Sequence, residues 1–273
     1  MDIPHLYRSN GMPFLVVDNS NSRHTGRLYL VWGDENNGDA NVLISYSDDA
    51  GANWSTPKPV HNDLVGKGKS QYLPNVALDQ TTGHIAVTYY DRRSSEHNVF
   101  SDVYVSVSTD GGEHFTDYRM NNLISSHAGE NVFSGDYIDI DFYNGKLSAI
   151  WAGYNETAKL YNRTLTLEEL DMLYPIHEVG QVQHYLTYQK KKPVVYIACT
   201  RPSDVEVTYY RKPLFSKKLK EKGKEQFNIN HRPGHQGFSE LRVQPSQKRR
   251  IKIVITPTET EMYPNAVDEI EIP

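Results

Sequence analysis

The sequence contains a single cysteine and no long apolar segment. Cys199 cannot form a disulfide within the chain, and because it lies in the apolar stretch Val194–Cys199 we expect a buried, inert thiol. No apolar run approaches the roughly 20 residues needed to cross a bilayer. The first residues, Met-Asp-Ile-Pro-His, lack the basic start and apolar core of a signal peptide. The sequence therefore predicts neither a disulfide nor a membrane span.

A basic excess is also missing, since the formal net charge is -5. Nucleic-acid binding calls for clustered positive charge, so we expect no nucleic-acid partner. Short basic runs do occur in the second half, at Lys190–Lys192, Lys217–Lys224 and Lys248–Arg250. We interpret them as solvated loops or strand edges.

Signatures of metal and cofactor sites are lacking as well. The histidines show no ligand spacing, and the chain has no glycine-rich phosphate loop and no nucleophile elbow. We therefore predict no metal site and no cofactor.

What the chain does contain is typical of an all-β protein. Its 273 residues are 38% hydrophobic, which is enough for one or two cores. Nineteen Tyr residues favour strands, while 14 Pro and 18 Gly indicate many turns.

A short motif occurs twice, each time directly after an alternating, strand-like stretch. It consists of Ser, Asp, Gly and an aromatic residue at fixed spacing: Ser47, Asp49, Gly51 and Trp54, then Ser108, Asp110, Gly112 and Phe115. Asp and Ser bond to nearby backbone, Gly takes positive φ, and the aromatic packs the turn onto the next layer. We call these two segments the box turns and expect them to be structural.

Three longer segments align around the box turns. Their glycines, Gly26, Gly83 and Gly145, are 57 and 62 residues apart, and Asp49 and Asp110 are 61 apart. This period suits a four-stranded propeller blade with one long loop. We predict about two and a half such blades.

These segments resemble the bacterial neuraminidase repeat, or Asp-box, proteins of the sialidase-like β-propeller superfamily. The resemblance covers about residues 10–155 and rests on the box turns, on Val87–Arg93 and on Gly135–Ile138. It implies a propeller whose box turns lie on the rim, away from any active site. An active sialidase of this kind uses a Tyr nucleophile with a Glu, an Asp acid/base and an Arg cluster. The Arg-Ile-Pro motif of the family is absent from this chain.

Four residues remain as candidates for ligand binding. Arg92 and Arg93 form a pair that either binds a ligand or makes salt bridges with Asp91, Glu96 or Asp102. The aromatics Tyr137 and Trp151 lie where a carbohydrate-binding propeller places stacking platforms; the alternative is packing between blades.

The character of the sequence changes after residue 155. Thr164–Tyr174 has a Thr start, early acidic residues and helical spacing, so we predict a helical linker over 161–176 between blades at 1–160 and a second domain at 177–273. In the second domain alternation predicts a β-sandwich of immunoglobulin-like size, with strands at Gln181–Gln189, Val194–Thr200, Val205–Arg211, Glu225–Asn230, Phe238–Val243 and Ile251–Ile255.

The blade count shapes the functional hypotheses, because a propeller needs at least four blades to close. We expect that a missing segment or another chain completes the ring. The favoured function is a non-catalytic, extracellular or cell-surface protein that binds a glycan or a surface protein. The alternatives are a sialidase-type glycosidase with catalytic residues partly outside this chain, and a subunit of a secretion or adhesion complex.

Overall fold

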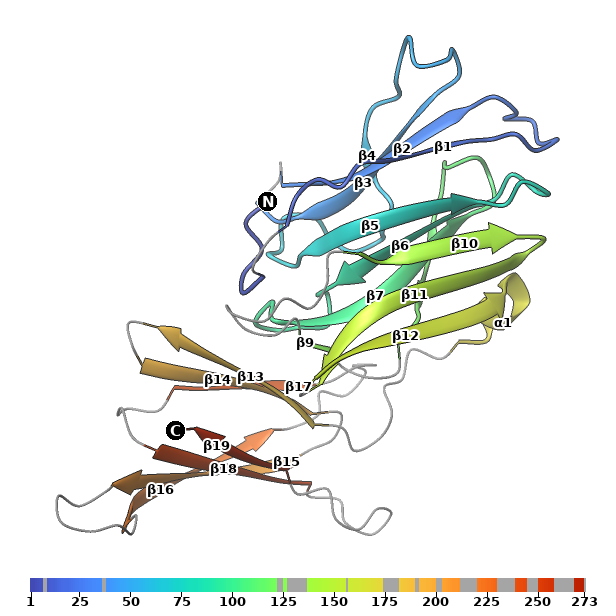
Figure 1. Cartoon of the computed structure of the whole chain (residues 1–273). Helices are drawn as coiled ribbons and strands as arrows, with labels where there is room; N and C mark the ends of the chain where they lie inside the picture. Colours follow the sequence, from blue (N-terminus) through green and yellow to red (C-terminus); the bar gives the residue numbers. More distant parts are fainter. Residues whose placement is uncertain are drawn as a thin grey trace. The chain divides into compact units, whose positions relative to one another are not determined.

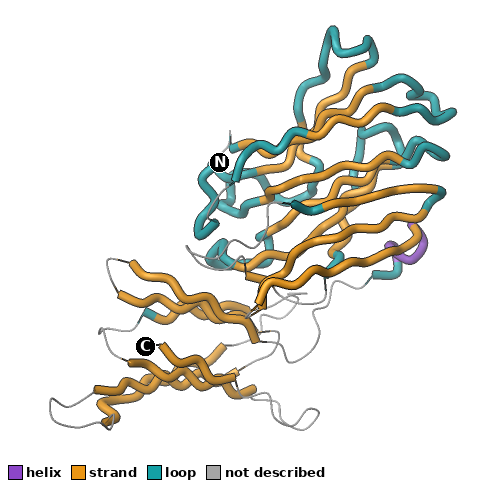
Figure 2. The backbone as a smooth tube through the Cα atoms, in the orientation of Figure 1, coloured by secondary structure: helices purple, strands orange, loops and turns teal. Residues whose placement is uncertain are grey.

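The computed structural model describes residues 1–6, 9–35, 38–121, 125–126, 137–155, 157–173, 182–189, 192–199, 203–211, 220–229, 239–244, 250–257 and 268–272. In these ranges the regular structure is antiparallel strands joined by loops, with one short helix (Figure 2), which confirms the predicted all-β fold. Two compact units are present: Met1–Asn121 with Ser125–Pro175, and Asn122–Ile124 with Ile176–Pro273.

In the first unit the described strands form three successive sheets, each a meander of antiparallel neighbours (Figure 1). Blade 1 contains β1 (Phe14–Val17), β2 (Leu28–Asp34), β3 (Asn41–Ser47) and β4 (Lys58–Pro59). Blade 2 contains β5 (Gln71–Leu78), β6 (Ile85–Asp91), β7 (Phe100–Ser108) and β8 (Thr116–Arg119), with β9 (Ser125–Ser126) paired to β7. Blade 3 contains β10 (Asp139–Tyr143), β11 (Lys146–Asn155) and β12 (Thr157–Thr166).

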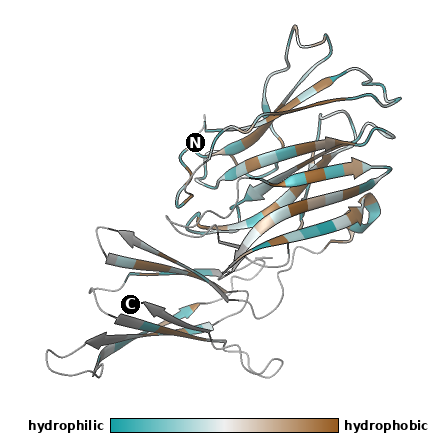
Figure 3. Ribbon diagram, viewed as in Figure 1, coloured by the Kyte–Doolittle hydropathy of each residue, from teal (hydrophilic) through white to brown (hydrophobic). Residues whose placement is uncertain are grey.

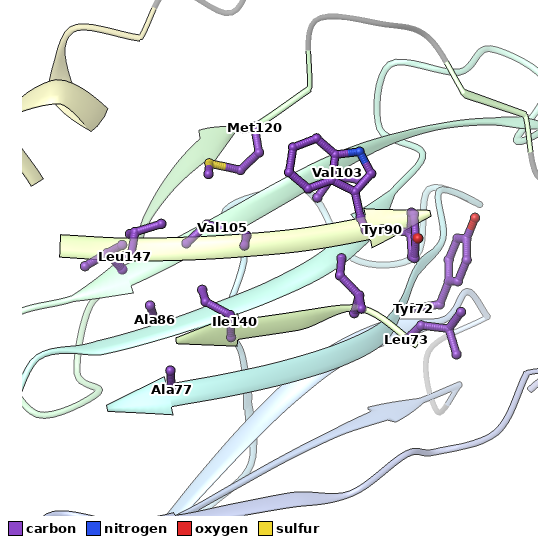
Figure 4. Close-up of a cluster of buried hydrophobic side chains, with 14 of the residues drawn as sticks. Tyr72, Leu73, Ala77, Ala86, Tyr90, Val103, Val105, Met120, Ile140 and Leu147 are labelled. Carbon is purple, nitrogen blue, oxygen red and sulfur yellow. The ribbon is translucent and has the colours of Figure 1, made fainter. Parts of the chain in front are cut away.

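The three blades pack face to face through two apolar clusters. Alternation along the strands gives each blade apolar faces, visible as alternating brown and teal bands in Figure 3. Tyr29 and Val31 of blade 1 share one cluster with Val87 of blade 2. Val105 of blade 2 shares the other with Leu147 of blade 3 (Figure 4). Because β5 contacts both β1 and β10, the first strands of the blades lie side by side, and the unit is a portion of a β-propeller, as predicted.

Blades 2 and 3 are also joined through their first turns. Asp79, which follows β5 and is fully buried, accepts the backbone N–H groups of Asn144 at 3.0 Å and Gly145 at 2.7 Å. Asn144 and Gly145 have φ values of 50° and 71°, as a two-residue hairpin turn between β10 and β11 requires. One carboxylate therefore caps the hairpin of the next blade.

The predicted helical linker is wrong in its extent. Residues 161–166 belong to β12, which pairs along its whole length with β11, and the helix α1 covers only Leu167–Asp171. Thr166 is its N-cap and forms a capping box with Glu169. Leu170 is buried in the cluster between blades 2 and 3, so α1 belongs to the first unit. The sequence spacing of residues 161–166 favours a helix, but their backbone hydrogen bonds to β11 make them part of a strand.

The second unit is a sandwich of two sheets, as predicted. One sheet contains β13 (Val182–Gln189), β14 (Lys192–Cys199) and β17 (Ser239–Val243); the other contains β16 (Lys220–Ile229), β15 (Ser203–Arg211), β18 (Arg250–Pro257) and β19 (Asp268–Ile272). Val195 and Ile197 of the first sheet pack with Val207 and Ile253 of the second. Cys199 is buried in the same core. The strand β19 was missed by the sequence analysis.

None of the helices in the described ranges has the length and apolar character needed to cross a bilayer.

Candidate functional site

The first box turn is closed by its own side chains. The Ser47 hydroxyl donates to Asp49 Oδ1 at 2.8 Å and accepts the Gly51 backbone N–H at 2.9 Å. The Asp49 carboxylate also accepts the Asn53 backbone N–H at 2.8 Å and its side-chain amide at 2.6 Å. These hydrogen bonds lower the pKa of Asp49 to about 2. Gly51 has a φ of 90°, and the Trp54 indole N–H donates to its carbonyl at 3.1 Å.

The second box turn repeats these contacts. Ser108 donates to Asp110 Oδ1 at 2.8 Å and accepts the Gly112 N–H at 2.9 Å. Asp110 accepts the His114 backbone N–H at 3.0 Å, and His114 Nδ1 lies 2.7 Å from its other oxygen. Phe115 packs against the cluster between blades 1 and 2. Both carboxylates bind their own turns, an arrangement that holds the turn between the third and fourth strands of a blade.

Arg92 lies inside the protein. Its side chain is fully buried, and Nη1 donates to the carbonyl oxygens of Pro4 at 2.7 Å and Asn98 at 2.6 Å. Nε donates to Ser101 Oγ at 3.2 Å, and the guanidinium lies 5.2 Å from the ring centre of Tyr72. Arg92 thus ties the N-terminal segment to the loop between β6 and β7.

Arg93 occupies a separate, part-buried ion-pair cluster. Nε and Nη2 donate to Asp91 Oδ2 at 2.9 and 2.7 Å, and Nη1 donates to Asp117 Oδ2 at 2.8 Å. Nη1 also donates to Asn62 Oδ1 at 2.9 Å, and the guanidinium lies 4.2 Å from the ring centre of Tyr104. Of the three predicted salt-bridge partners, the structure brings Asp91 to this guanidinium.

Asp117 completes the cluster and was missed by the sequence analysis. It lies on β8 opposite Ser106, whose hydroxyl donates to Asp117 Oδ1 at 2.7 Å. The hydroxyl groups of Tyr89 and Ser106 lie 2.7 Å apart. No motif marks Asp117; the signal is the register of β8 on β7, which the repeat alignment does not supply.

Burial shapes the electrostatics of the cluster. It raises the pKa of Asp91 above its ordinary value, although the adjacent Arg93 opposes this shift. His61 is buried nearby, against the Tyr89 ring at a centroid distance of 6.2 Å, and neither ring nitrogen has a hydrogen-bond partner among the described residues. Burial, followed by the charge of Arg93, lowers the pKa of His61 to about 4. His61 is therefore neutral at pH 7.

The two aromatic candidates lie in different environments. Trp151 is 6% exposed and stacks on Tyr161 at a centroid distance of 6.3 Å, so its ring packs in the core between blades 2 and 3. Tyr137 is 75% exposed. It precedes β10, whose start is held by Asn75: the Asn75 amide donates to Ile138 O and Asp139 Oδ1, each at 3.0 Å. Tyr137 and the exposed Asp139 thus lie at the inner edge of blade 3.

The described residues contain no group of three or more His, Cys, Asp or Glu side chains able to hold a metal ion.

The ion pairs of Arg93 restrict its ability to bind a ligand. Breaking a buried ion pair costs about 3–5 kcal/mol, so Arg93 cannot bind a ligand carboxylate without first losing Asp91 or Asp117.

No family model matches this chain, and no curated protein matches it. Among solved structures it is similar to an α-L-arabinofuranosidase from Fusarium graminearum bound to an iminosugar inhibitor, with a TM-score of 0.42 and 12% identity over 100% of this chain and 83% of that one. It is similar to the Hadza microbial sialidase, with a TM-score of 0.41 and 10% identity over 90% and 53%. It is also similar to the intramolecular trans-sialidase of Ruminococcus gnavus, with a TM-score of 0.34 and 13% identity over 79% and 42%. The likeness concerns the fold and assigns no activity.

Proposed function

We propose that this protein is a non-catalytic binding protein that acts outside the cell or at the cell surface and presents its blades to a glycan or a surface protein. The observation that supports the proposal is the engagement of Arg92 and Arg93 inside blade 2. A sialidase needs arginines whose guanidinium groups face the substrate carboxylate. These two are bound to protein oxygens instead.

The inner edge of blade 3 is the surface proposed for the ligand. Tyr137 offers an exposed ring that can stack on the apolar face of a sugar, and the neighbouring Asp139 carboxylate can accept sugar hydroxyl hydrogens. Asn75 fixes the backbone beside them. This surface needs no metal or cofactor.

Two measurements on the purified chain test the proposal. Fluorogenic α-sialoside and α-L-arabinofuranoside substrates should release no product above a heat-inactivated control. A glycan array should give saturable binding, and Tyr137→Ala should weaken it about ten-fold, since a stacked ring contributes on the order of 1 kcal/mol. Tyr143→Ala is the matched control, because Tyr143 is 66% exposed at the other end of β10. Turnover that disappears in Asp139→Asn would contradict the proposal.

The second candidate function is a glycoside hydrolase of the exo-sialidase type with catalytic residues partly outside this chain. Exposed carboxylates at Asp139 and Asp141, close in sequence to the exposed Tyr137, favour it. The same substrate assay, run on the native assembly isolated from cells and not on the purified chain alone, separates it from the first.

The extracellular location is part of the proposal, and the resemblance of the repeats supports it. Labelling of intact cells with a membrane-impermeant amine reagent should modify the native protein and leave a cytoplasmic control unmodified. Labelling only after lysis would place the protein inside the cell.

A further inference from the structure

The face of blade 3 that points away from blade 2 is polar. The strands β10, β11 and β12 lie side by side (Figure 1), and their pairing arranges six side chains of this face in two rows. The first row is Asp139, Ile150 and Asn162, and the second is Asp141, Ser148 and Thr164. Ser148 is half-buried and the other five are exposed. We call these two rows the polar face of blade 3.

The internal repeat shows that the same positions are mostly apolar where one blade packs on the next. Aligning Gly26, Gly83 and Gly145 matches the six residues, row by row, with Phe14, Val31, Ile44, Val16, Tyr29 and Tyr46 of blade 1 and with Asn75, Thr88, Val105, Ala77, Ala86 and Val107 of blade 2. The six of blade 1 pack in or against the cluster shared with blade 2, and four of blade 2 belong to the cluster shared with blade 3. Burying two unpaired carboxylates against an apolar surface is unfavourable, so the polar face suits a hydrated ligand better than a further blade.

The polar face has hydrogen-bond acceptors that the protein itself leaves unused. Oδ1 of Asp139 and Oδ1 of Asp141 each accept the backbone N–H of the next residue, at 2.9 and 2.8 Å. Oδ1 of Asp139 also accepts the side-chain amide of Asn75 at 3.0 Å. The second oxygen of each carboxylate and the amide of Asn162 have no hydrogen-bond partner among the described residues. These groups remain able to bind a ligand.

The spacing of the groups fits a chain of sugar rings. Neighbouring strands lie about 4.8 Å apart, so the Asp139 carboxylate and the Asn162 amide are separated by about 10 Å, with Ile150 between them. Ile150 is 42% exposed and can pack on the C–H face of a ring whose hydroxyl groups reach the polar groups on either side. The second row lies about 7 Å farther along the strands. It adds a carboxylate and two hydroxyl groups whose oxygens lie 2.8 Å apart.

We propose that the polar face of blade 3 binds an uncharged oligosaccharide chain and excludes acidic glycans, such as those that contain sialic or uronic acid. The two carboxylates accept sugar hydroxyl hydrogens. Neither row contains a cation that would offset their repulsion of a ligand carboxylate. This inference rests on the proposed function, because the polar face begins at Asp139 beside the exposed Tyr137 ring, and it adds the class of the ligand.

Affinity electrophoresis of the full-length chain tests the proposal. The neutral polymers in the gels are arabinan, xylan, galactan and β-glucan, and the acidic ones are polygalacturonate and polysialic acid. At least one neutral polymer should retard the chain relative to a gel without polymer, and neither acidic polymer should. In calorimetry, oligosaccharides of the polymer that binds should bind about ten-fold or more tightly than its monosaccharide, since both rows contribute hydrogen bonds.

A double variant, Asp139→Asn with Asp141→Asn, keeps the shape of both side chains and removes their charges. It should bind the neutral polymer about ten-fold more weakly, because charged acceptors form hydrogen bonds roughly twice as strong as neutral ones. The acidic polymers should retard it more than they retard the wild type, since the repulsion is gone. Asp204→Asn is the matched control, because Asp204 is an exposed strand aspartate of the second unit and accepts the Asn228 amide at 2.8 Å, as Asp139 accepts that of Asn75. It should bind like the wild type.

The outcomes separate this inference from the proposed function. Stronger retardation by acidic than by neutral polymers would overturn the inference and leave glycan binding in place. Neutral binding that Tyr137→Ala weakens and the double variant does not would have the same meaning, since the ligand would then contact the inner edge alone. Absence of binding to every glycan, in the gels and on the array, would contradict the proposed function as well.

Discussion

Replacement of Asp79 by Asn should weaken the connection between blades 2 and 3. The Asp79 carboxylate accepts the backbone N–H and hydroxyl of Thr81 at 2.9 and 2.7 Å, in addition to the backbone N–H groups of Asn144 and Gly145. Burial raises the pKa of Asp79, but these hydrogen bonds outweigh it and lower the pKa to about 2. The Asn side chain of Asp79→Asn has one acceptor oxygen in place of two. Its amide nitrogen therefore faces at least one of these donors, which is left without an acceptor.

Two arguments give the same magnitude for the loss. A pKa lowered from 3.8 to about 2 corresponds to about 2 kcal/mol of stability at neutral pH. A buried N–H left without its acceptor costs about 1–3 kcal/mol. We therefore expect Asp79→Asn to lower the free energy of unfolding of the first unit by about 2 kcal/mol at pH 7.

The pH dependence follows from the sign of the shift. The folded pKa lies below the unfolded value, so the carboxylate stabilises the fold above about pH 4 and loses this effect as the pH falls toward 2. The difference between wild type and Asp79→Asn should shrink to about half by pH 3.

Urea unfolding followed by tryptophan fluorescence measures the effect. All three Trp residues lie in the first unit, so the signal reports that unit and not the sandwich. Asp141→Asn is the matched control, since Asp141 aligns with Asp79 in the third repeat but is exposed. Equal losses in the two variants, or a difference that stays constant down to pH 2, would refute the reasoning.

Two further predictions concern the contacts of blade 2. Gly83→Ala should destabilise the first unit by about 2–4 kcal/mol, because φ is 78° and an added Cβ meets Ser22 Cβ at 2.6 Å. Gly26→Ala is the control at the aligned position: φ is 90°, but an added Cβ meets nothing within 4 Å, so this variant should lose only about 1 kcal/mol of unfolding free energy in the same urea assay. Equal losses in Gly83→Ala and Gly26→Ala would mean that the contact of Gly83 with Ser22 does not contribute. His61, whose pKa is lowered from 6.5 to about 4, should make the fold less stable by up to about 3 kcal/mol as the pH falls from 6.5 to 4, because the unfolded chain binds the additional proton. His61→Phe should remove this dependence in thermal unfolding at stepped pH, and an unchanged slope would show that His61 is not its source.

Much of the candidate site could be predicted from the sequence because its chemistry is local. Ser47, Asp49 and Gly51 close their turn within five residues, and the same spacing at Ser108 produces the same hydrogen bonds. The roles of Arg93 and Trp151 could not be predicted in this way. Arg93 binds Asp117, 24 residues away, through the register of β8 on β7. Trp151 is buried by its neighbours in the core.

The sequence by itself determined the strands, the turns and their repetition, because side-chain alternation and turn chemistry act within a few residues. It also predicted about two and a half blades, fewer than the four that a closed propeller needs. Tertiary structure decided which faces are covered and which arginines are engaged, because both depend on residues brought together from distant parts of the chain. Packing between blades buries Val87 and leaves its counterpart Leu30 half-open. Two residues that are equivalent in sequence therefore differ in surroundings, since only one has a neighbouring blade on its side.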